Sequence, residues 1–482
     1  MGCRKRKRRT IMKKLLFIFL LFPFVVNATN YTWSTGTSSI NISDSGPFGN
    51  LNAGDTVFIP VRSGDWYSYS VTNCDSGTPG GYIVVYWMPG AKIAINNNTF
   101  NNYITNSSGV KTVGMEADNN PTIWRMGTTG YNNYIWFDSC SFNSTSGFGP
   151  YYTGALTAFN GNIANSMHHW KWTYCSFLGV YTGNTSGVAI TIGGNFPPTR
   201  YSFWFDTEVS NCTFSDYPSN GAASNFISAF NCYNTVIRNN TFTNLGVVAT
   251  PTGHAAVINA YAFHGQIYNN LFGPFNFGNA VRGKFAHCPS MGAAYTGLTK
   301  IYNNIIKNQR KYPGFEVQSC DTTGYSNGGV VLARNDSTPY FWNNTAYNLA
   351  VGVGNSPYIA ALIDDYLSSA VVTAKNNVWV LLRDSVCSPN AWVQGIVAAS
   401  GTSISYDTAR NRFNCTTWTG FADSTLFTPS ANGMLNNTGL TPPSWLTTDI
   451  YGNARTQGGG TDIGAVERSA AVVRKNLPLI FF

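Results

Sequence analysis

Charged residues are scarce in this sequence of 482 residues. Asp, Glu, Lys and Arg make up 11% of it, against roughly a quarter in an average soluble domain. Such a low charge, with 43% hydrophobic residues, excludes a disordered acidic or basic chain. The strong helix formers Leu, Glu and Lys are thin outside a few segments, whereas Tyr, Phe, Trp and Thr are plentiful. The composition therefore favours extended structure with a large buried core.

Acidic residues are absent from the N-terminus, where most of the net charge of +9 lies. Eight basic residues precede residue 15, so the rest of the chain is close to neutral and nucleic acid is not an expected partner. They are followed by an apolar run over 15–26 and a small-residue cleavage site at Ala28, which is the order of a secretory signal peptide. We therefore expect a signal peptide over 1–28 and an extracytoplasmic location.

Three alternatives for this segment stay open: a basic nucleic-acid arm, lipidation at Cys3, and a membrane anchor. The apolar run is shorter than the ~20 residues that a membrane span requires, so no transmembrane span is expected in the mature chain. Met12 also begins a complete leader by itself. Residues 1–11 are therefore a candidate mis-assigned extension.

The sequence contains no C-x-x-C pair that would indicate structural zinc. Ten cysteines are present, and nine remain when Cys3 is set aside with the leader. Because nine is odd, at least one thiol is free or pairs with another chain.

A short strand that follows a small polar residue recurs along the chain at intervals of 28 to 42 residues. This spacing suits one solenoid coil of short strands with a loop of variable length. Asparagine fits such an anchor because it tolerates the left-handed conformation and can hydrogen-bond an asparagine one coil away. The three cysteines in this register would stack as a buried thiol ladder or contain one disulfide. The anchors are Asn98, Cys140, Cys175, Cys212, Asn240, Asn270, Asn304, Asn344 and Asn377.

These repeats resemble the coils of right-handed parallel β-helix proteins, the architecture of pectate lyases, many polysaccharide-degrading enzymes and phage tailspikes. Residues 53–59 resemble a first coil, and 449–455 with 461–467 resemble the closing segment of many secreted β-helix proteins. The resemblance implies an all-β, single-stranded right-handed parallel β-helix of roughly ten or more coils.

Domain boundaries follow from these matches. We expect an N-terminal cap over 29–50, the β-helix over 51–440, a closing motif over 441–468 and an apolar tail over 469–482. In the closing motif Arg455 would pair with Asp462 or Glu467 and the segment would cover the last strand edge. The tail would pack against the end of the helix or against a partner chain.

An active site on such a solenoid would be a column of outward side chains on successive coils. Positions that lie the same number of residues after the anchors Asn240, Asn270 and Asn304 should stack on successive coils. We expect these positions to form one exposed face that carries most of the charge in this region. Its members are His254, Arg282, Lys284, Glu316 and Gln318, with His287 and Arg310 as further substrate-binding candidates. The simplest alternative is a structural ion pair between Arg282 and Glu316.

This column has the groups that β-elimination on a uronate requires. Arg282 would bind the sugar carboxylate, Lys284 or His254 would remove the C5 proton, and Glu316 would orient Arg282 or bind Ca²⁺. No cofactor is required with certainty; Ca²⁺ is the one candidate. A glycoside hydrolase would need two carboxylates, and this hypothesis ranks lower because neighbouring strand residues face opposite sides. Its candidates are Glu316, Asp321, Asp336, Asp364 and Asp365.

Two function classes therefore remain open. The first, slightly favoured, is a non-catalytic surface or adhesion protein that binds polysaccharide or a cell-surface glycan. The second is a polysaccharide lyase on an acidic glycan, with a hydrolase and a virion tailspike as weaker alternatives. A sugar-stacking platform around His168, His169 and Trp170, with Tyr151 and Tyr152, is a further hypothesis; a core role for these aromatic residues is the alternative.

Overall fold

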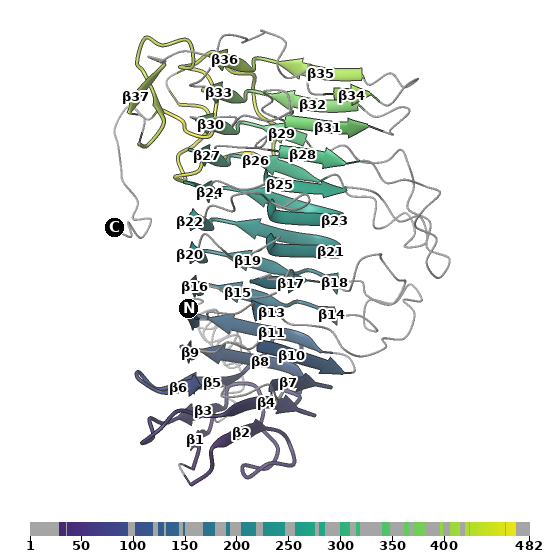
Figure 1. Cartoon of the computed structure of the whole chain (residues 1–482), viewed down its shortest axis with the longest axis vertical. Coiled ribbons are helices and arrows are strands. Elements are labelled where there is room, and N and C mark those ends of the chain that lie inside the picture. The colour runs from purple at the N-terminus through teal and green to yellow at the C-terminus, as the bar shows by residue number, and fades with distance from the viewer. Residues whose placement is uncertain are drawn as a thin grey trace, which may run out of the picture.

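The computed structural model is a solenoid of short parallel strands (Figure 1). Among the strands that it describes, every pairing is parallel except that of β37 (Phe421–Asp423) with β38 (Thr428–Pro429). The prediction of an all-β parallel β-helix is confirmed. The structure describes residues 28–34, 36–94, 102–118, 124–129, 132–143, 148–149, 167–178, 189–192, 204–217, 225–245, 256–274, 279–284, 299–308, 315–318, 340–347, 361–365, 371–380, 396–398, 405–414, 420–423, 425–457 and 459–468.

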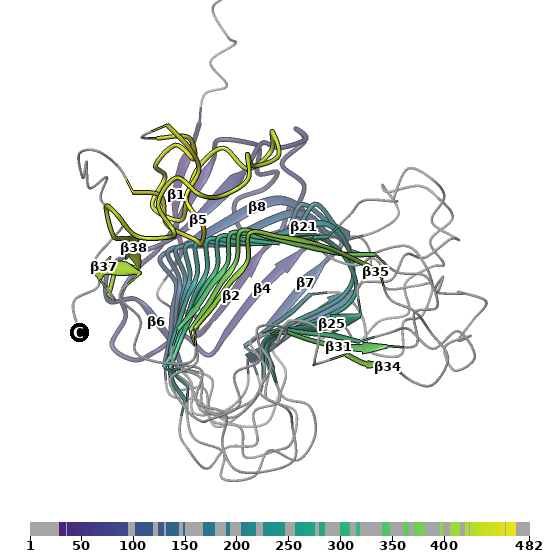
Figure 2. The ribbon, with the colours of Figure 1, turned by 90° about the horizontal axis from the view of Figure 1, so that it is seen from above.

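Each coil runs through three faces, and Figure 2 shows the strands of successive coils superimposed along the axis. Face 1 contains β2 (Ser39–Ile42), β4 (Ser68–Thr72), β7 (Asn102–Thr105), β10 (Trp124–Thr129), β13 (Phe148–Gly149), β17 (Ile190–Ile192), β25 (Asn279–Lys284), β28 (Phe315–Gln318), β31 (Ala361–Asp365) and β34 (Ile396–Ala398). Face 2 contains β1 (Asn30–Thr32), β3 (Thr56–Ile59), β5 (Ile83–Trp87), β8 (Ser108–Val113), β11 (Asn133–Asp138), β15 (Lys171–Thr173), β19 (Glu208–Ser210), β26 (Lys300–Tyr302), β29 (Tyr340–Trp342), β32 (Val371–Lys375) and β35 (Ser405–Ala409).

Face 3 is the 11-stranded sheet. It contains β6 (Lys92–Ala94), β9 (Glu116–Asp118), β12 (Ser141–Asn143), β16 (Ser176–Leu178), β20 (Thr213–Tyr217), β22 (Thr241–Leu245), β24 (Leu271–Phe272), β27 (Ile305–Lys307), β30 (Thr345–Tyr347), β33 (Val378–Val380) and β36 (Arg412–Asn414). The long strands β21 (Asn225–Arg238) and β23 (Ala256–Tyr268) continue from face 1 into face 2. The short strands β14 (Met167–His168) and β18 (Trp204–Phe205) lie at the corner between these faces.

Parallel pairing begins inside the segment that we expected to be a cap. β1 pairs with β3 and β2 pairs with β4, so strands of the first coil lie before residue 51. Trp33 packs its ring against Phe48 with a centroid distance of 5.5 Å. The sequence 53–59 therefore forms a strand of the following coil.

The core of the solenoid is built from equivalent side chains that stack from coil to coil. On face 3, five phenylalanines form one column with ring centroids 4.7 to 4.9 Å apart. Each such contact contributes ~0.5–1.5 kcal/mol beyond the buried area. Repetition of one aromatic residue per coil therefore both fills the core and fixes the register. The column consists of Phe142, Phe177, Phe214, Phe242 and Phe272.

The tight turn from face 2 to face 3 uses a left-handed residue in each coil. This residue is the one before each predicted anchor; Asn239, Asn269 and Asn303 have φ of 56°, 55° and 54°. The expectation that the anchor itself adopts this conformation is therefore corrected by one position. In the coil before Cys140, Gly114 takes the left-handed position and Met115 the anchor position, because β9 pairs with β12. Asn98 lies outside the described residues.

The anchor asparagines form a continuous ladder inside the turn. The Asn240 Nδ2 atom donates to Asn270 Oδ1 at 3.0 Å, and the same contact joins each asparagine to the next as far as Asn411. Each Nδ2 also donates to a backbone carbonyl, as from Asn304 to Ile267 O at 2.9 Å. The ladder is buried, so these bonds satisfy groups that water cannot reach.

Three cysteines continue the ladder toward the N-terminus. Cys140, Cys175 and Cys212 are buried free thiols, so the thiol ladder is correct and the disulfide alternative is not. The Cys212 Sγ atom donates to Trp172 O at 3.5 Å, in the place that Asn240 Nδ2 fills on the next coil. Burial raises the pKa of Cys175 well above its usual range.

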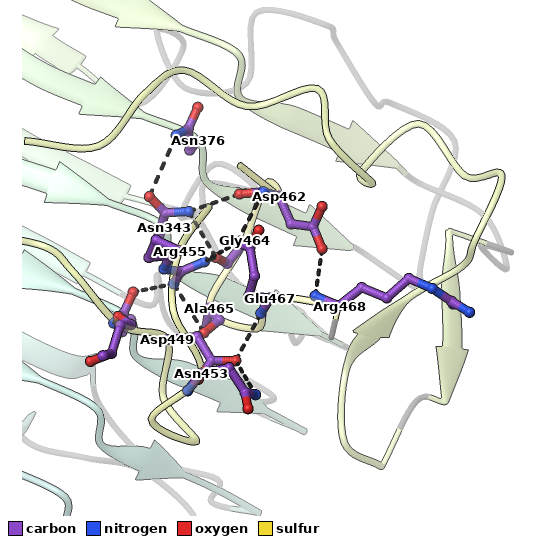
Figure 3. Close-up of polar contacts among 12 residues, drawn as sticks. Asn343, Asn376, Asp449, Asn453, Arg455, Asp462, Gly464, Ala465, Glu467 and Arg468 are labelled. Carbon is purple, nitrogen blue, oxygen red and sulfur yellow. Dashed lines mark hydrogen bonds and ion pairs between the residues drawn. The ribbon is translucent and has the colours of Figure 1, made fainter. Parts of the chain in front are cut away.

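The closing segment, defined as residues 441–468, lies along the corner between faces 2 and 3 (Figures 1 and 3). The side chain of Asn303 donates to Thr448 O, and that of Asn343 donates to Asp462 O and Gly464 O. We expected this segment to cover the last strand edge, but its described contacts are lateral. The reason is that the left-handed asparagines point their amides outward and give the segment a row of donors.

A buried polar network holds the closing segment together (Figure 3). Arg455 donates to Gly464 O at 2.9 Å and lies 3.6 Å from Glu467 Oε2, which confirms the predicted Arg455–Glu467 pair. Asp449 accepts the backbone N–H of Asn453 at 2.7 Å and of Glu467 at 2.9 Å. These charged residues therefore have a structural role.

The described part of the chain contains no helix that is long and apolar enough to cross a bilayer. The predicted leader, apart from Ala28, and the apolar tail 469–482 lie outside the described residues.

Candidate functional site

The strand register of face 1 aligns the central residues of the predicted column. Arg282 on β25 pairs with Glu316 on β28, as the sequence predicted. On the other side Arg282 pairs with Asn259 of β23, which in turn pairs with Ser228 of β21. We call Ser228, Asn259, Arg282 and the position of Glu316 the polar row.

A second row lies two residues further along the same strands. Lys284 pairs with Tyr261, and Gln318 pairs with Asp364 of β31. Because strand residues alternate between faces, this row and the polar row share one side of the sheet, and Asp365 falls on the other. The sequence prediction did not include Tyr261 in this row.

The alignment of His254 with Lys284 is corrected by the register. Tyr261 occupies the position opposite Lys284, and Asn259 lies opposite Arg282. The coil that starts at Asn240 has seven more residues before face 1 than the coil that starts at Asn270. His254, His287 and Arg310 lie outside the described residues, as do Asp321 and Asp336.

We expected this column to form an exposed face, but the polar row is buried. Ser228 is 1% exposed, Asn259 6% and Arg282 7%. Their strand neighbours Ile227, Ile258 and Val281 belong to the hydrophobic core, so the polar row occupies the opposite, outer side of the sheet. A guanidinium held at such low exposure is costly unless polar groups surround it.

Two atoms of the polar row have no hydrogen-bond partner among the residues that the structure describes. They are Ser228 Oγ and Asn259 Oδ1, and both are inaccessible to solvent. A buried polar atom without a partner costs ~1–3 kcal/mol. Serine hydroxyls and asparagine amides can both donate and accept, so the pair is suited to a ligand that is itself rich in hydroxyl groups. These residues were missed from the sequence because small polar residues are common in every coil.

The outer side of face 2 also carries charged side chains, and several of them are paired with one another. Lys111 lies 2.7 Å from Asp138 and 3.6 Å from the centroid of the Trp136 ring. Arg238 donates to Glu208 at 2.9 Å. This surface is therefore held together by internal contacts, in contrast to Ser228 Oγ and Asn259 Oδ1 of the polar row.

The predicted aromatic platform is divided by the fold. Trp170 is fully buried in the core, where its Nε1 donates to Asn132 O at 2.8 Å. Tyr151 and Tyr152 lie outside the described residues. His168 and His169 instead form a pair at the corner between faces 1 and 2, with their Nδ1 atoms 2.8 Å apart.

Two neighbours complete this corner. The Tyr134 ring stacks on the His169 ring at 4.4 Å, and Asp206 Oδ2 lies 3.9 Å from His169 Nε2. Burial, reinforced by the neighbouring imidazole, lowers the pKa of His168 to about 4. Burial also lowers the pKa of His169, although Asp206 opposes this shift. Both rings are therefore neutral at pH 7.

Among the side chains that the structure describes, no group of three or more His, Cys, Asp or Glu residues is placed to hold a metal ion. The side chain of Glu316, the proposed Ca²⁺ ligand, is not among those described.

Comparison with known proteins finds similarity in solved structures. No known family and no curated protein matches the sequence. The chain is similar to the pectate lyase Pel9A, with 13% identity over 92% of this chain and 98% of that one and a TM-score of 0.41. It is also similar to an alginate lyase from Paenibacillus sp. str. FPU-7, with 11% identity, 78% and 99% coverage and a TM-score of 0.37. A tailspike protein of E. coli bacteriophage HK620 has 12% identity, 86% and 63% coverage and a TM-score of 0.37. The similarity is one of backbone fold. The parallel strand pairing described above is the direct evidence for that fold.

Proposed function

We propose that this chain is an extracytoplasmic protein that binds an acidic polysaccharide along the polar row of face 1. The observation that carries the proposal is the pair of buried, unpartnered atoms Ser228 Oγ and Asn259 Oδ1 beside Arg282. A ligand hydroxyl that donates to Asn259 Oδ1 and one that bonds Ser228 Oγ would remove two unfavourable terms that the free protein carries.

The charge of the ligand follows from Arg282. A guanidinium presents a planar fork of N–H donors that matches a carboxylate, and an interaction with it is strengthened by low exposure to water. Lys284, in the neighbouring row, adds a second cation at the same level of the solenoid. A glycan with uronate carboxylates satisfies both the cations and the unpartnered polar atoms.

The repeat of the fold suits a polymer. Successive rungs of the polar row are about 4.8 Å apart, the strand spacing of a sheet. A ligand that lies across the strands therefore meets Ser228, Asn259 and Arg282 in turn. This arrangement favours an extended chain over a single small sugar.

Affinity electrophoresis through gels that contain uronans or neutral glycans tests the proposal. We expect wild-type protein to be retarded by at least one uronan, and Ser228→Ala and Asn259→Ala each to reduce that retardation several-fold. Ser70→Ala on β4 is the matched control, since Ser70 Oγ already donates to Ile40 O. Equal retardation of wild type and both polar-row variants, or none on any glycan, would contradict the proposal.

A second candidate function is β-elimination by the same site. It is favoured by the register that sets Tyr261 opposite Lys284, one row from Arg282. Lys284 would take the C5 proton, the C4–C5 double bond would form as the C4–O bond breaks, and the Tyr261 hydroxyl would protonate the leaving oxygen. Arg282 would neutralise the carboxylate that makes the C5 proton acidic.

Ultraviolet absorbance of the unsaturated uronate separates this candidate from binding alone. A rise with wild-type protein that is abolished by Lys284→Met, with binding retained, would establish elimination. Binding without any rise, with and without added Ca²⁺, would leave the non-catalytic function.

The extracytoplasmic location rests on the leader. Basic residues, the apolar run 15–26 and the site at Ala28 have the composition of a cleaved signal peptide. N-terminal sequencing of the exported protein is expected to begin near Thr29. An intact leader on the mature protein would contradict this part of the proposal.

A further inference from the structure

The His168–His169 pair brings together two nitrogen atoms that ordinarily point apart. Neighbouring residues of a regular strand project to opposite faces. His169 departs from this rule because its φ of 58° is left-handed, and the turn brings both rings to one side of the corner. Their Nδ1 atoms lie 2.8 Å apart, so in the free protein one imidazole donates its hydrogen to the other.

This separation matches that of two ligands on one metal ion. With metal–nitrogen distances of about 2.0 Å, ligands at a right angle lie about 2.8 Å apart, whereas tetrahedral ligands lie about 3.3 Å apart. Right angles are typical of the tetragonal or square-planar geometry of Cu²⁺ and Ni²⁺, and the tetrahedral angle is typical of Zn²⁺. The corner therefore fits an ion of the first kind.

The surroundings of the pair suit a bound cation. The His169 side chain is 36% exposed and His168 is 8% exposed, so an ion would approach the pair from the side of His169. Asp206 faces the other ring nitrogen of His169, where metal-binding histidines commonly have a carboxylate. Asn234 Nδ2 donates to Asp206 Oδ1 and holds that carboxylate in place. Lys171 is the nearby opposing charge.

We propose that His168 and His169 form a binding site for a divalent transition metal with tetragonal preference, Cu²⁺ or Ni²⁺, through their two Nδ1 atoms. The ion replaces the shared hydrogen. As the donor ring loses its Nδ1 proton it takes up a proton at Nε2, so both imidazoles bind as neutral ligands, and water fills the other coordination positions. The site lies apart from the polar row, so it is independent of the glycan proposal.

Titration of the full-length mature protein with Ni²⁺ by calorimetry, and electron paramagnetic resonance with Cu²⁺, test this site. We expect one equivalent of Ni²⁺ to bind at pH 7.5 and the Cu²⁺ spectrum to show coupling to two nitrogens. His168→Phe and His169→Phe should each weaken this binding at least ten-fold. Ni²⁺ is the primary probe because it does not oxidise thiols.

Two controls keep the outcome unambiguous. His287→Phe removes a histidine elsewhere in the chain and should leave the stoichiometry and affinity unchanged. Asp206→Asn keeps both ring nitrogens, and we expect it to weaken binding by a smaller factor than either histidine variant while the two-nitrogen spectrum remains. Circular dichroism of each variant verifies the fold. Two results would overturn the proposal. One is undiminished metal binding in folded His168→Phe and His169→Phe. The other is the absence of binding by the wild type at metal concentrations up to the concentration of the protein.

Discussion

Asn259 lies opposite Arg282 on adjacent strands of face 1, and its Oδ1 atom is buried there without a hydrogen-bond partner. Asn240, which begins the same coil, is equally buried but bonds Asn270 and Val209 O. Two asparagines of one coil thus have opposite roles. The bonded one maintains the solenoid, and the unbonded one is the group to which our proposal assigns a ligand hydroxyl.

Replacement of Asn259 by leucine should separate stability from binding. Because Asn259→Leu removes a buried, unpartnered oxygen, we expect the free energy of unfolding to stay constant or to rise by about 1 kcal/mol. Glycan affinity should fall ~5–10-fold, which corresponds to the loss of one hydrogen bond. Urea unfolding and affinity electrophoresis measure the two effects. A clear loss of stability would show that Asn259 has a structural partner.

Replacement of Asn304 should have the reverse effect. Its side chain accepts from Asn270 and donates to Asn344 and to Ile267 O. Asn304→Ala leaves several buried groups unsatisfied, so we expect unfolding to become easier by ~2–4 kcal/mol. The exposed Asn41→Ala is the control, with an expected change within ~0.5 kcal/mol. A loss at Asn304 no larger than at Asn41 would contradict the stabilising role of the ladder.

The buried thiols should be unreactive in the folded protein. Burial raises the pKa of Cys74 to about 12 and that of Cys140 well above its usual range, so little thiolate is present at pH 8. We expect Cys74, Cys140 and Cys175 to remain unmodified by iodoacetamide in buffer and to react fully in guanidinium chloride. Mass spectrometry of labelled peptides measures each cysteine. Rapid labelling of Cys175 in the folded state would show that the thiol ladder opens to solvent.

The closing segment should weaken as the pH rises. Burial, with Asp462 nearby, raises the pKa of Glu467 from 4.5 to about 8. A carboxyl whose pKa is raised on folding stabilises the folded state fully below pH 4.5 and loses that contribution as the pH passes through about 8. We expect the urea midpoint to fall between pH 5 and pH 9, and Glu467→Gln to flatten this dependence.

A control for this pH dependence is Glu116→Gln, because Glu116 forms a partly exposed ion pair with Lys92. Its profile should follow that of the wild type. An identical slope in Glu467→Gln and the wild type would assign the pH dependence to another group.

Much of the fold was predictable because one physical constraint repeats. Every coil must bury an anchor at the same turn, so Asn240, Asn270 and Asn304 recur with a recognisable context. The position of the left-handed residue was predicted one place too late because asparagine also occupies the preceding position, as at Asn239. The lateral docking of Arg455 was not predictable because its partner Asn303 is distant in sequence.

The candidate site was predicted in part for a related reason. The coils that start at Asn270 and Asn304 have the same number of residues before face 1, so equal offsets aligned Arg282 with Glu316 correctly. The coil from Asn240 is longer at this point, and the same offset selected His254 where the strand has Tyr261. The length of the loop before face 1 differs between coils and follows no sequence pattern. Only the strand pairing therefore reveals which residue of the coil from Asn240 lies opposite Lys284.

The most direct test of the central claim compares a uronan with its carboxyl-reduced counterpart. Equilibrium affinities of both glycans are measured for wild-type protein and Arg282→Gln. We predict that the wild type prefers the uronan at least ten-fold and that Arg282→Gln loses most of this preference while it still binds the reduced glycan. An equal preference in both proteins, or none in the wild type, would contradict the assignment of the polar row as a site for acidic polysaccharide.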